Sequence, residues 1–179
     1  METDKRLMAK TSNGDRKAFA KLVEKYQKLA WSIAYRLLHE PSEAEDVVQE
    51  AFMKIFRNAE NYRPLARFNT YLTRVVTRLC YDHWKKKRPL YINPDDRPTE
   101  PAPAASPLDE LQDAENRRVI RRAVDSLPQR ERVAIVLQHY EGFSYREIAE
   151  SLDATEKAVE RLLARARQRL QENLQEFFF

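Results

Sequence analysis

The chain has 179 residues, of which 42% are hydrophobic and 34% charged, so it is long enough for one medium domain or two small ones. It holds only two glycines, which argues against a turn-rich β-protein and excludes a glycine-rich phosphate loop, while the abundance of helix formers predicts an all-α fold. A single cysteine, Cys80, excludes a disulfide framework, and the three scattered histidines predict neither a metal site nor a cofactor.

The net charge of +4 is distributed unevenly along the chain. Residues 1–88 hold 19 Lys and Arg against 11 Asp and Glu, residues 89–115 hold one against seven, and residues 116–179 hold 12 against 10. Basic blocks suit contact with nucleic acid, whereas an acidic linker does not lie on phosphate. No segment approaches the roughly 18 apolar residues of a membrane span, and the N-terminus lacks the apolar core of a signal peptide. We therefore expect a cytoplasmic protein without membrane insertion.

A proline-rich segment divides the chain. Most of the nine prolines fall within residues 89–108, which have no periodic apolar pattern and therefore predict a flexible linker. We expect one small helical domain over residues 1–88 and a second over residues 109–179. Helical periodicity places the elements at about 3–12, 15–38, 43–58, 68–87, 109–125, 128–140, 144–151 and 155–173.

The helix predicted at about 43–58 has an exposed face suited to a protein partner. Ser42 and Glu45 have the spacing of a capping box at its start. The residues expected on the exposed face are Asp46, Gln49, Glu50, Met53 and Arg57. An acidic cluster with an exposed methionine fits docking on a basic protein surface, and an ordinary solvated face is the alternative.

The helix predicted at about 68–87 interleaves aromatic and cationic residues. Those on or beside its polar side are Tyr71, Arg74, Arg78, Tyr81, Trp84 and Lys85. Aromatic rings stack on unpaired bases and cations follow phosphates, so this side favours single-stranded DNA. An amphipathic helix with a solubilising end is the alternative.

Residues 141–170 have the pattern of a helix-turn-helix. Ser144 and Glu147 form a predicted capping box, Asp153 falls in the turn, and Thr155 is expected to cap the second helix. The start of that helix carries the residues expected to read bases in the major groove: Thr155, Glu156, Lys157, Glu160, Arg161, Ala164 and Arg165. A solvated face with Glu–Arg pairs is the alternative.

Three segments in this order resemble bacterial sigma factors of the extracytoplasmic-function group. DVVQEAFMKIFR (46–57) is similar to the core-binding segment, and FNTYLTRVVTRLCYDHWKKKR (68–88) is similar to the promoter-melting, −10-reading segment. Residues 126–170 are similar to region 4 of the same group. The resemblance covers about residues 15–173, and the proline-rich linker stands where this group lacks a domain. Region 2 below means residues 1–88, and region 4 means residues 109–179.

The resemblance implies an alternative sigma factor whose partners are core RNA polymerase, promoter DNA and an anti-sigma factor. Region 2 would bind the polymerase clamp through the 46–57 face, and region 4 would bind the flap and read the −35 element. The loop before residue 68 would hold a flipped −10 base, with these residues forming or bordering the pocket: Asn61, Tyr62, Arg63, Phe68 and Asn69.

The chain departs from the family pattern at three places. Tyr71 stands where the family usually has tryptophan, and Asp153 stands where it usually has glycine in the helix-turn-helix turn. Glu160-Arg161-Leu162 replaces the common Lys-Ser-Arg run. Because aspartate tolerates a left-handed backbone better than most residues, we expect the turn to be retained and the −35 sequence to differ.

Two other functions fit part of the pattern. A stand-alone helix-turn-helix regulator would use the N-terminal part as a sensor or dimerisation domain and bind duplex DNA without polymerase. A helical adaptor would bind no DNA and would show an affinity that salt hardly changes. No grouping of carboxylates, serine or histidine supports catalysis, so we expect no enzymatic activity.

Overall fold

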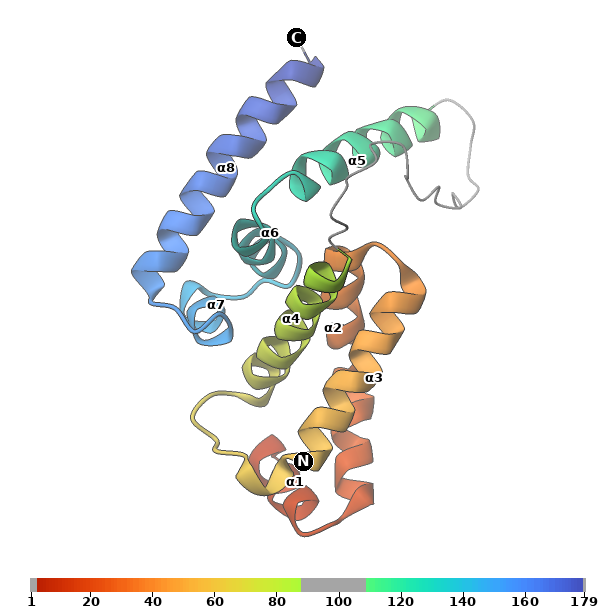
Figure 1. Cartoon of the computed structure of the whole chain (residues 1–179), viewed down its shortest axis with the longest axis vertical. Coiled ribbons are helices and arrows are strands. Elements are labelled where there is room, and N and C mark those ends of the chain that lie inside the picture. The colour runs from red at the N-terminus through yellow and green to blue at the C-terminus, as the bar shows by residue number, and fades with distance from the viewer. Residues whose placement is uncertain (1–2, 88–108, 179) are drawn as a thin grey trace.

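The computed structural model describes residues 3–87 and 109–178, and within these residues every regular element is helical (Figure 1). The all-α fold predicted from the sequence is therefore confirmed. The linker predicted at residues 89–108 lies outside the described residues.

Region 2 is a bundle built around one long helix. Its elements are α1 (Asp4–Ser12), α2 (Arg16–Leu38), α3 (Pro41–Arg57), the short 3-10 helix η1 (Ala59–Asn61) and α4 (Phe68–Lys86). Helix α2 packs against α1, α3 and α4, and α3 also packs against α4. The side chains fully buried between them include Leu22, Ile33, Leu37, Ile55, Phe68, Leu72 and Val76. Burial of each such side chain contributes about 1.5–3 kcal/mol, which is what holds the bundle together.

One helix start in region 2 is set by a side-chain cap, and one predicted capping signal is wrong. Asp15 caps α2, because its Oδ1 accepts hydrogen bonds from the backbone N–H groups of Lys17 and Ala18 at 2.9 and 3.0 Å. The expected capping box of Ser42 and Glu45 does not form, since α3 already begins at Pro41. Proline fits the first turn of a helix, where no backbone N–H is needed, and it therefore moves the start one residue ahead of Ser42.

Region 4 contains α5 (Asp109–Asp125), α6 (Gln129–Ile135), the π-helical turn η2 (Val136–Tyr140), α7 (Tyr145–Ser151) and α8 (Glu156–Phe178). Helices α5, α6 and α7 all pack against α8. The continuous helix predicted at 128–140 is interrupted by η2, at the place where this segment meets α2. A π-turn widens the helix locally and is often found at functional contacts.

The helix-turn-helix forms as predicted. The Ser144 Oγ accepts from the Glu147 N–H at 3.3 Å, and the Glu147 carboxylate accepts from the Ser144 N–H at 3.0 Å, which completes the capping box. The Thr155 Oγ1 accepts from the Ala158 N–H at 3.1 Å and caps α8. Asp153 adopts φ 51°, the left-handed conformation expected for the turn.

The two regions pack directly against one another. Helix α4 contacts α7 and helix α2 contacts η2, so α4 lies between the rest of region 2 and the helix-turn-helix (Figure 1). Buried apolar side chains of both regions belong to one continuous cluster. The regions share an extensive contact, so their packing alone does not divide the chain into two domains. The two-domain division stays a prediction.

Candidate DNA and polymerase interfaces

The exposed face of α3 gathers the five residues predicted to meet the polymerase. Ala44, Val47, Ala51 and Ile55 are buried on the opposite side of the helix. The five residues on the outer side are all exposed: Asp46, Gln49, Glu50, Met53 and Arg57. Met53 is 50% exposed, which is unusual for so large an apolar side chain. The structure therefore leaves this surface available for a partner.

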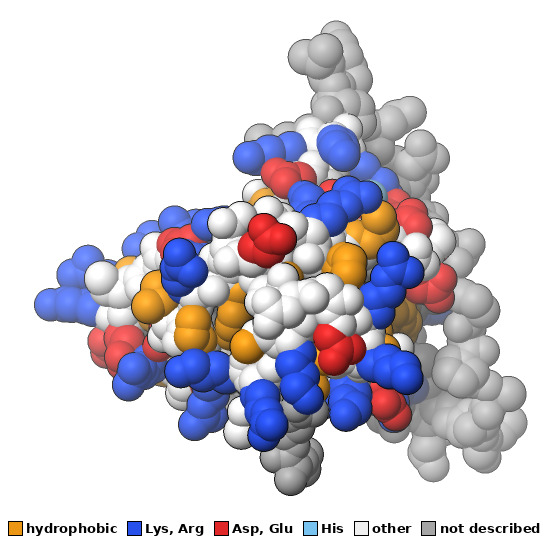
Figure 2. Space-filling model, turned by 90° about the horizontal axis from the view of Figure 1, so that it is seen from below, with side chains coloured by type: hydrophobic (Ala, Val, Ile, Leu, Met, Phe, Trp, Pro, Cys, Tyr) orange, Lys and Arg blue, Asp and Glu red, His pale blue; other side chains and the backbone are white. Residues whose placement is uncertain are grey.

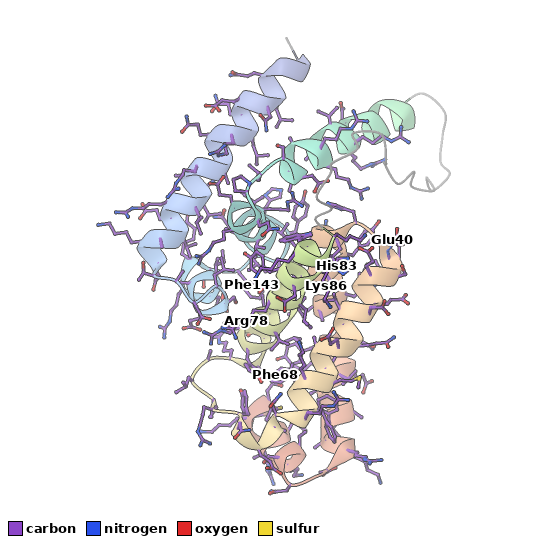
Figure 3. The ribbon with its side chains drawn as sticks, in the orientation of Figure 1. Glu40, Phe68, Arg78, His83, Lys86 and Phe143 are labelled. Carbon is purple, nitrogen blue, oxygen red and sulfur yellow. The ribbon has the colours of Figure 1, made fainter. Side chains whose placement is uncertain are left out.

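A cavity of about 880 Å³ opens in front of the loop that precedes α4. Tyr62, Phe68 and Asn69 line it, as expected for a −10 pocket, whereas Asn61 and Arg63 are exposed and do not line it. Phe68 is only 2% exposed, so it supports the cavity from the core instead of presenting a free ring (Figure 3).

Aromatic rings form a continuous wall behind this cavity. Tyr26 lies 5.0 Å from Phe68, Phe68 lies 6.3 Å from Tyr71, and Tyr71 lies 5.0 Å from Tyr62, each measured between ring centroids. Burial raises the pKa of Tyr62 and of Tyr71 above the ordinary value for tyrosine. Of the four rings, Tyr26 and Tyr62 line the cavity without being buried in the core.

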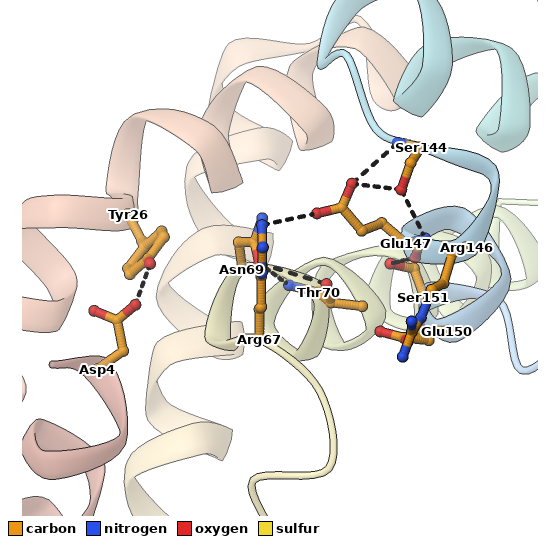
Figure 4. A network of polar contacts seen from close by, with 10 residues as sticks. All are labelled: Asp4, Tyr26, Arg67, Asn69, Thr70, Ser144, Arg146, Glu147, Glu150 and Ser151. Atoms are coloured by element: carbon orange, nitrogen blue, oxygen red, sulfur yellow. Dashed lines mark hydrogen bonds and ion pairs between the residues drawn. The ribbon is translucent and has the colours of Figure 1, made fainter.

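Sequence reasoning missed the cavity residues supplied by other elements. Asp4 from α1 accepts a hydrogen bond from the Tyr26 hydroxyl at 2.5 Å, and it forms an ion pair with Lys25 at 2.7 Å. Arg67 lies 3.7 Å from the Glu147 carboxylate of region 4, across the cavity (Figure 4). No local pattern marks Asp4, because only the packing of α1 on α2 brings it to the site.

The predicted −10 side of α4 is largely turned toward region 4. Arg74 Nε and Arg78 Nη2 donate to Asp153 Oδ2 at 2.9 and 2.6 Å. The Trp84 ring lies 5.2 Å from the Arg132 guanidinium. Lys85, Lys86 and Lys87, at the C-terminal end of α4, stay exposed. Lys and Arg side chains are spread over the face of the molecule that is seen from below (Figure 2).

Tyr81, another α4 aromatic residue predicted to meet DNA, is partly buried beside region 4. Burial raises its pKa to about 12, and its hydroxyl has no hydrogen-bond partner among the described residues. A second cavity, of about 580 Å³, lies beside it between α4 and region 4 and is also lined by Arg78, Lys85 and Arg130. In this arrangement Tyr81 is not free to stack on a base.

The recognition surface of α8 is open by contrast. The seven residues predicted to read the −35 element are all exposed: Thr155, Glu156, Lys157, Glu160, Arg161, Ala164 and Arg165. Val159, Leu163 and Ala166 are fully buried on the other side and fix the helix on α6 and α7. Farther along, Arg167 donates to Gln138 Oε1 at 2.9 Å and braces α8 against η2.

The described residues show no other kind of site. Within residues 3–87 and 109–178, no cluster of three or more His, Cys, Asp or Glu side chains could hold a metal ion. None of the described helices is long and apolar enough to cross a membrane.

Two sigma-70 family models match the chain. The Sigma-70 region 2 model matches residues 22–89, and the Sigma-70, region 4 model matches residues 117–170. The ECF RNA polymerase sigma factor SigW of Bacillus subtilis is 30% identical over 96% of this chain and 97% of its own length. The ECF RNA polymerase sigma-E factor of Escherichia coli K12 is 32% identical over 97% of this chain and 95% of its own length.

Solved structures have the same fold. CnrH in complex with the cytosolic domain of CnrY superimposes with a TM-score of 0.72 at 25% identity, covering 98% of this chain and 99% of CnrH. The sigma factor RpoE in complex with the anti-sigma factor NepR, from Bartonella quintana, gives a TM-score of 0.67 at 25% identity, covering 89% and 98%. The chain belongs to the ECF RNA polymerase sigma factors and is an alternative sigma factor that directs transcription initiation. The comparisons give no support to a stand-alone regulator.

Proposed function

We propose that this sigma factor divides its work among three surfaces: α3 binds core RNA polymerase, α4 with its cavity opens and holds the −10 element, and α8 reads the −35 element. The observation that carries this assignment is that the three surfaces lie on separate helices and do not overlap. The three partners would therefore contact different residues. The role proposed for these residues is binding, not catalysis.

The α3 surface suits the polymerase clamp because it combines charge with one exposed apolar side chain. Asp46 and Glu50 supply carboxylates for a basic partner, and Met53 supplies flexible apolar area. The Glu50–Lys54 ion pair at 3.0 Å is exposed and easily exchanged for a partner contact. We also propose, from the family resemblance, that region 4 makes a second contact with core RNA polymerase, at the polymerase flap.

The −10 function rests on the cavity and its aromatic wall. A base that leaves the duplex can enter the cavity and stack on Tyr62, which lines it, and such a stack is worth about 1–3 kcal/mol. Asn69 borders the same cavity and offers amide groups for hydrogen bonds to a base edge. Arg74, Arg78 and Lys85 would then hold the backbone of the unpaired strand.

The −35 function rests on α8, where Glu160 and Arg161 stand one turn into the exposed face. Arginine bonds guanine in a bidentate manner and glutamate accepts from cytosine, each good contact being worth about 1–3 kcal/mol of discrimination. This pair is the place where we expect promoter choice to differ from that of relatives.

An anti-sigma factor is the further partner that we propose. Two of the solved structures with this fold are complexes, one of CnrH with the cytosolic domain of CnrY and one of the sigma factor RpoE with the anti-sigma factor NepR. The exposed faces of α3 and α8 are the surfaces that such a protein would have to cover to prevent both polymerase and promoter binding.

The decisive experiment is reconstitution with core RNA polymerase, genomic DNA and sequencing of the transcripts. We expect promoter-specific transcripts only when the chain is added, and Glu50→Lys should reduce binding to core polymerase by at least about tenfold because it reverses a docking charge. Glu24→Lys, an identical change at an exposed position of α2, is the matched control and should bind normally.

Two outcomes would count against the proposal. Absence of any complex with core polymerase contradicts the assignment of the polymerase partner. Equal affinity of Glu50→Lys and the unchanged chain contradicts the α3 surface alone, and leaves the −10 and −35 surfaces to be tested separately.

A further inference from the structure

One carboxylate of region 4 is held by two arginines of region 2. Asp153 Oδ2 accepts from Arg74 Nε at 2.9 Å and from Arg78 Nη2 at 2.6 Å, and Asp153 Oδ1 also pairs with the Arg74 guanidinium. Arg78 lies on the side of α4 that faces α7 (Figure 3). Two cations one helical turn apart, converging on one anionic group, form the arrangement that also binds a DNA phosphate.

The cationic pair on α4 is built for an anion. Burial and the neighbouring positive charge of Arg78 lower the pKa of Arg74 below its usual range. Without an anion between them, the two guanidinium groups repel one another. Asp153 supplies that anion in the free chain, and a backbone phosphate has the same charge sign and similar acceptor geometry.

Asp153 is not needed to build the turn in which it lies. Its φ of 51° is a conformation that glycine adopts without strain and that aspartate merely tolerates. Thr155 caps α8, the helix that follows, so the Asp153 carboxylate is not needed as its cap. An aspartate at this position therefore adds a charge to the turn, and the structure directs that charge at α4.

Two further ion pairs between the regions have the same polarity. Region 2 contributes Arg36 and Arg67, and region 4 contributes Glu141 and Glu147, with 3.7 Å between the charged atoms in each pair. Ser32 also donates to Glu141 at 2.6 Å. Region 4 thus presents carboxylates to a basic surface of region 2, as nucleic acid would present phosphates.

We propose that Arg74 and Arg78 form a clamp for one phosphate of the −10 strand, and that Asp153 occupies this clamp in the free protein as an intramolecular competitor. This inference rests on the −10 role proposed above for α4. The clamp with Asp153 in it is called the Asp153 latch. While the latch is closed, region 2 cannot bind the −10 strand, although the −35 surface of α8 stays open.

The latch is weak enough to be reversible. The side chains are partly exposed, 36% for Arg74, 66% for Arg78 and 46% for Asp153, so water and salt screen the pairs. Removing the Asp153 charge should shift the closed-to-open ratio by about threefold to tenfold. A strand of several phosphates can therefore displace a single carboxylate.

The first test measures the distance between the regions in the full-length protein without polymerase. Fluorophores at Glu24→Cys on α2 and Gln168→Cys on α8 report the distance by energy transfer, while Cys80, which is fully buried, should resist labelling. Asp153→Asn removes the charge and keeps a residue that tolerates the left-handed turn. We expect lower energy transfer for Asp153→Asn and a smaller response to added salt than in the unchanged protein.

The matched control is Glu150→Gln, which removes the same charge from α7. Glu150 pairs with Arg146 on its own helix at 3.1 Å, so this change should leave the distance unchanged. Arg78→Gln should open the molecule as Asp153→Asn does, and the double variant should open it no further, because direct partners are not additive. Additive effects, or no effect of Asp153→Asn on the distance, would overturn the latch.

The second test measures binding of a fluorescein-labelled single-stranded DNA of mixed sequence to the same free proteins. Asp153→Asn should bind about threefold to tenfold more tightly, since the apparent affinity rises with the open fraction. Glu172→Gln, which removes a carboxylate at an exposed position of α8 outside the cavities, is the control here and should not bind more tightly. Equal gains in both variants would show general electrostatics and overturn the competition. Failure of the polymerase experiment would leave the distance test intact, so the two proposals can fail separately.

Discussion

The two helices assigned to DNA, α4 in region 2 and α8 in region 4, differ in what covers them. Helix α8 buries one side on its own region and exposes all seven predicted contact residues. Helix α4 buries one side on α2 and α3 and turns much of its polar side to region 4, where Arg74 and Arg78 meet Asp153. The structure thus exposes one of the two proposed promoter-reading surfaces and shields the other.

The difference follows from the chemistry of the two surfaces. Helix α4 pairs aromatic rings with cations, which suits unpaired bases and phosphates but also attracts any acidic neighbour. Helix α8 mixes Glu and Arg near its start, so its charges are balanced locally. The more strongly basic surface is the one that region 4 covers.

The largest expected effect tests whether the two regions are separate folding units. Leu72 in α4 and Leu163 in α8 are both completely buried, and each change to alanine should cost about 2–5 kcal/mol of unfolding free energy. If the predicted domains fold independently, urea unfolding followed by a probe in each region will show only the altered region destabilised. Coincident shifts of both transitions would instead show one cooperative unit.

A smaller effect is expected at the open surface. Arg161→Ala should remove about 1–3 kcal/mol of discrimination at the −35 element without changing core polymerase binding. The measurement is holoenzyme binding to promoter fragments with altered −35 bases. Arg117→Ala, at an exposed position of α5, is the control and should preserve the base preference. An unchanged preference in Arg161→Ala would remove this residue from the reading surface.

The third effect is a loss of folding stability at alkaline pH, and it concerns Tyr81 on the surface of α4 that region 4 covers. Burial raises the pKa of Tyr81 from 10.0 to about 12. The buried phenol therefore contributes stability that is fully present below pH 10 and is lost as pH rises through 12, an effect of about 2 kcal/mol. Burial also raises the pKa of Cys80 to about 12, which acts in the same direction.

Tyr81→Phe separates the two alkaline contributions. The variant should match the unchanged protein at neutral pH, because the Tyr81 hydroxyl has no partner to lose among the described residues. Above pH 10 it should retain more stability, measured by urea unfolding and by energy transfer between the regions. The same pH profile in Tyr81→Phe and in Tyr140→Phe, an exposed position, would show that Tyr81 is not the group that titrates.

Much of the local structure could be predicted because its causes are local. Ser144 and Glu147 are three residues apart and form their capping box from backbone geometry alone. The same rule failed at Ser42, because Pro41 starts α3 earlier. The exposed residues of α3 follow from helical periodicity, which needs no knowledge of the partner helix.

The candidate sites were predicted only in part, because their walls come from distant segments. Tyr62, Phe68 and Asn69 are neighbours in sequence and were expected at the −10 cavity. Asp4 reaches it only through the packing of α1 on α2, and Arg67 meets Glu147 only because region 4 lies alongside.

The sequence by itself determined the all-α class and the exposed faces of the helices, because periodicity, capping and residue chemistry act within a few turns of chain. Its resemblance to a known family supplied the two sigma regions, and the roles of the three surfaces stay predictions. The tertiary structure alone decided that α4 is covered. Asp153 lies 79 and 75 residues from Arg74 and Arg78, and no local pattern relates residues so far apart. Their meeting depends on the packing of α7 against α4, which is a property of the folded chain.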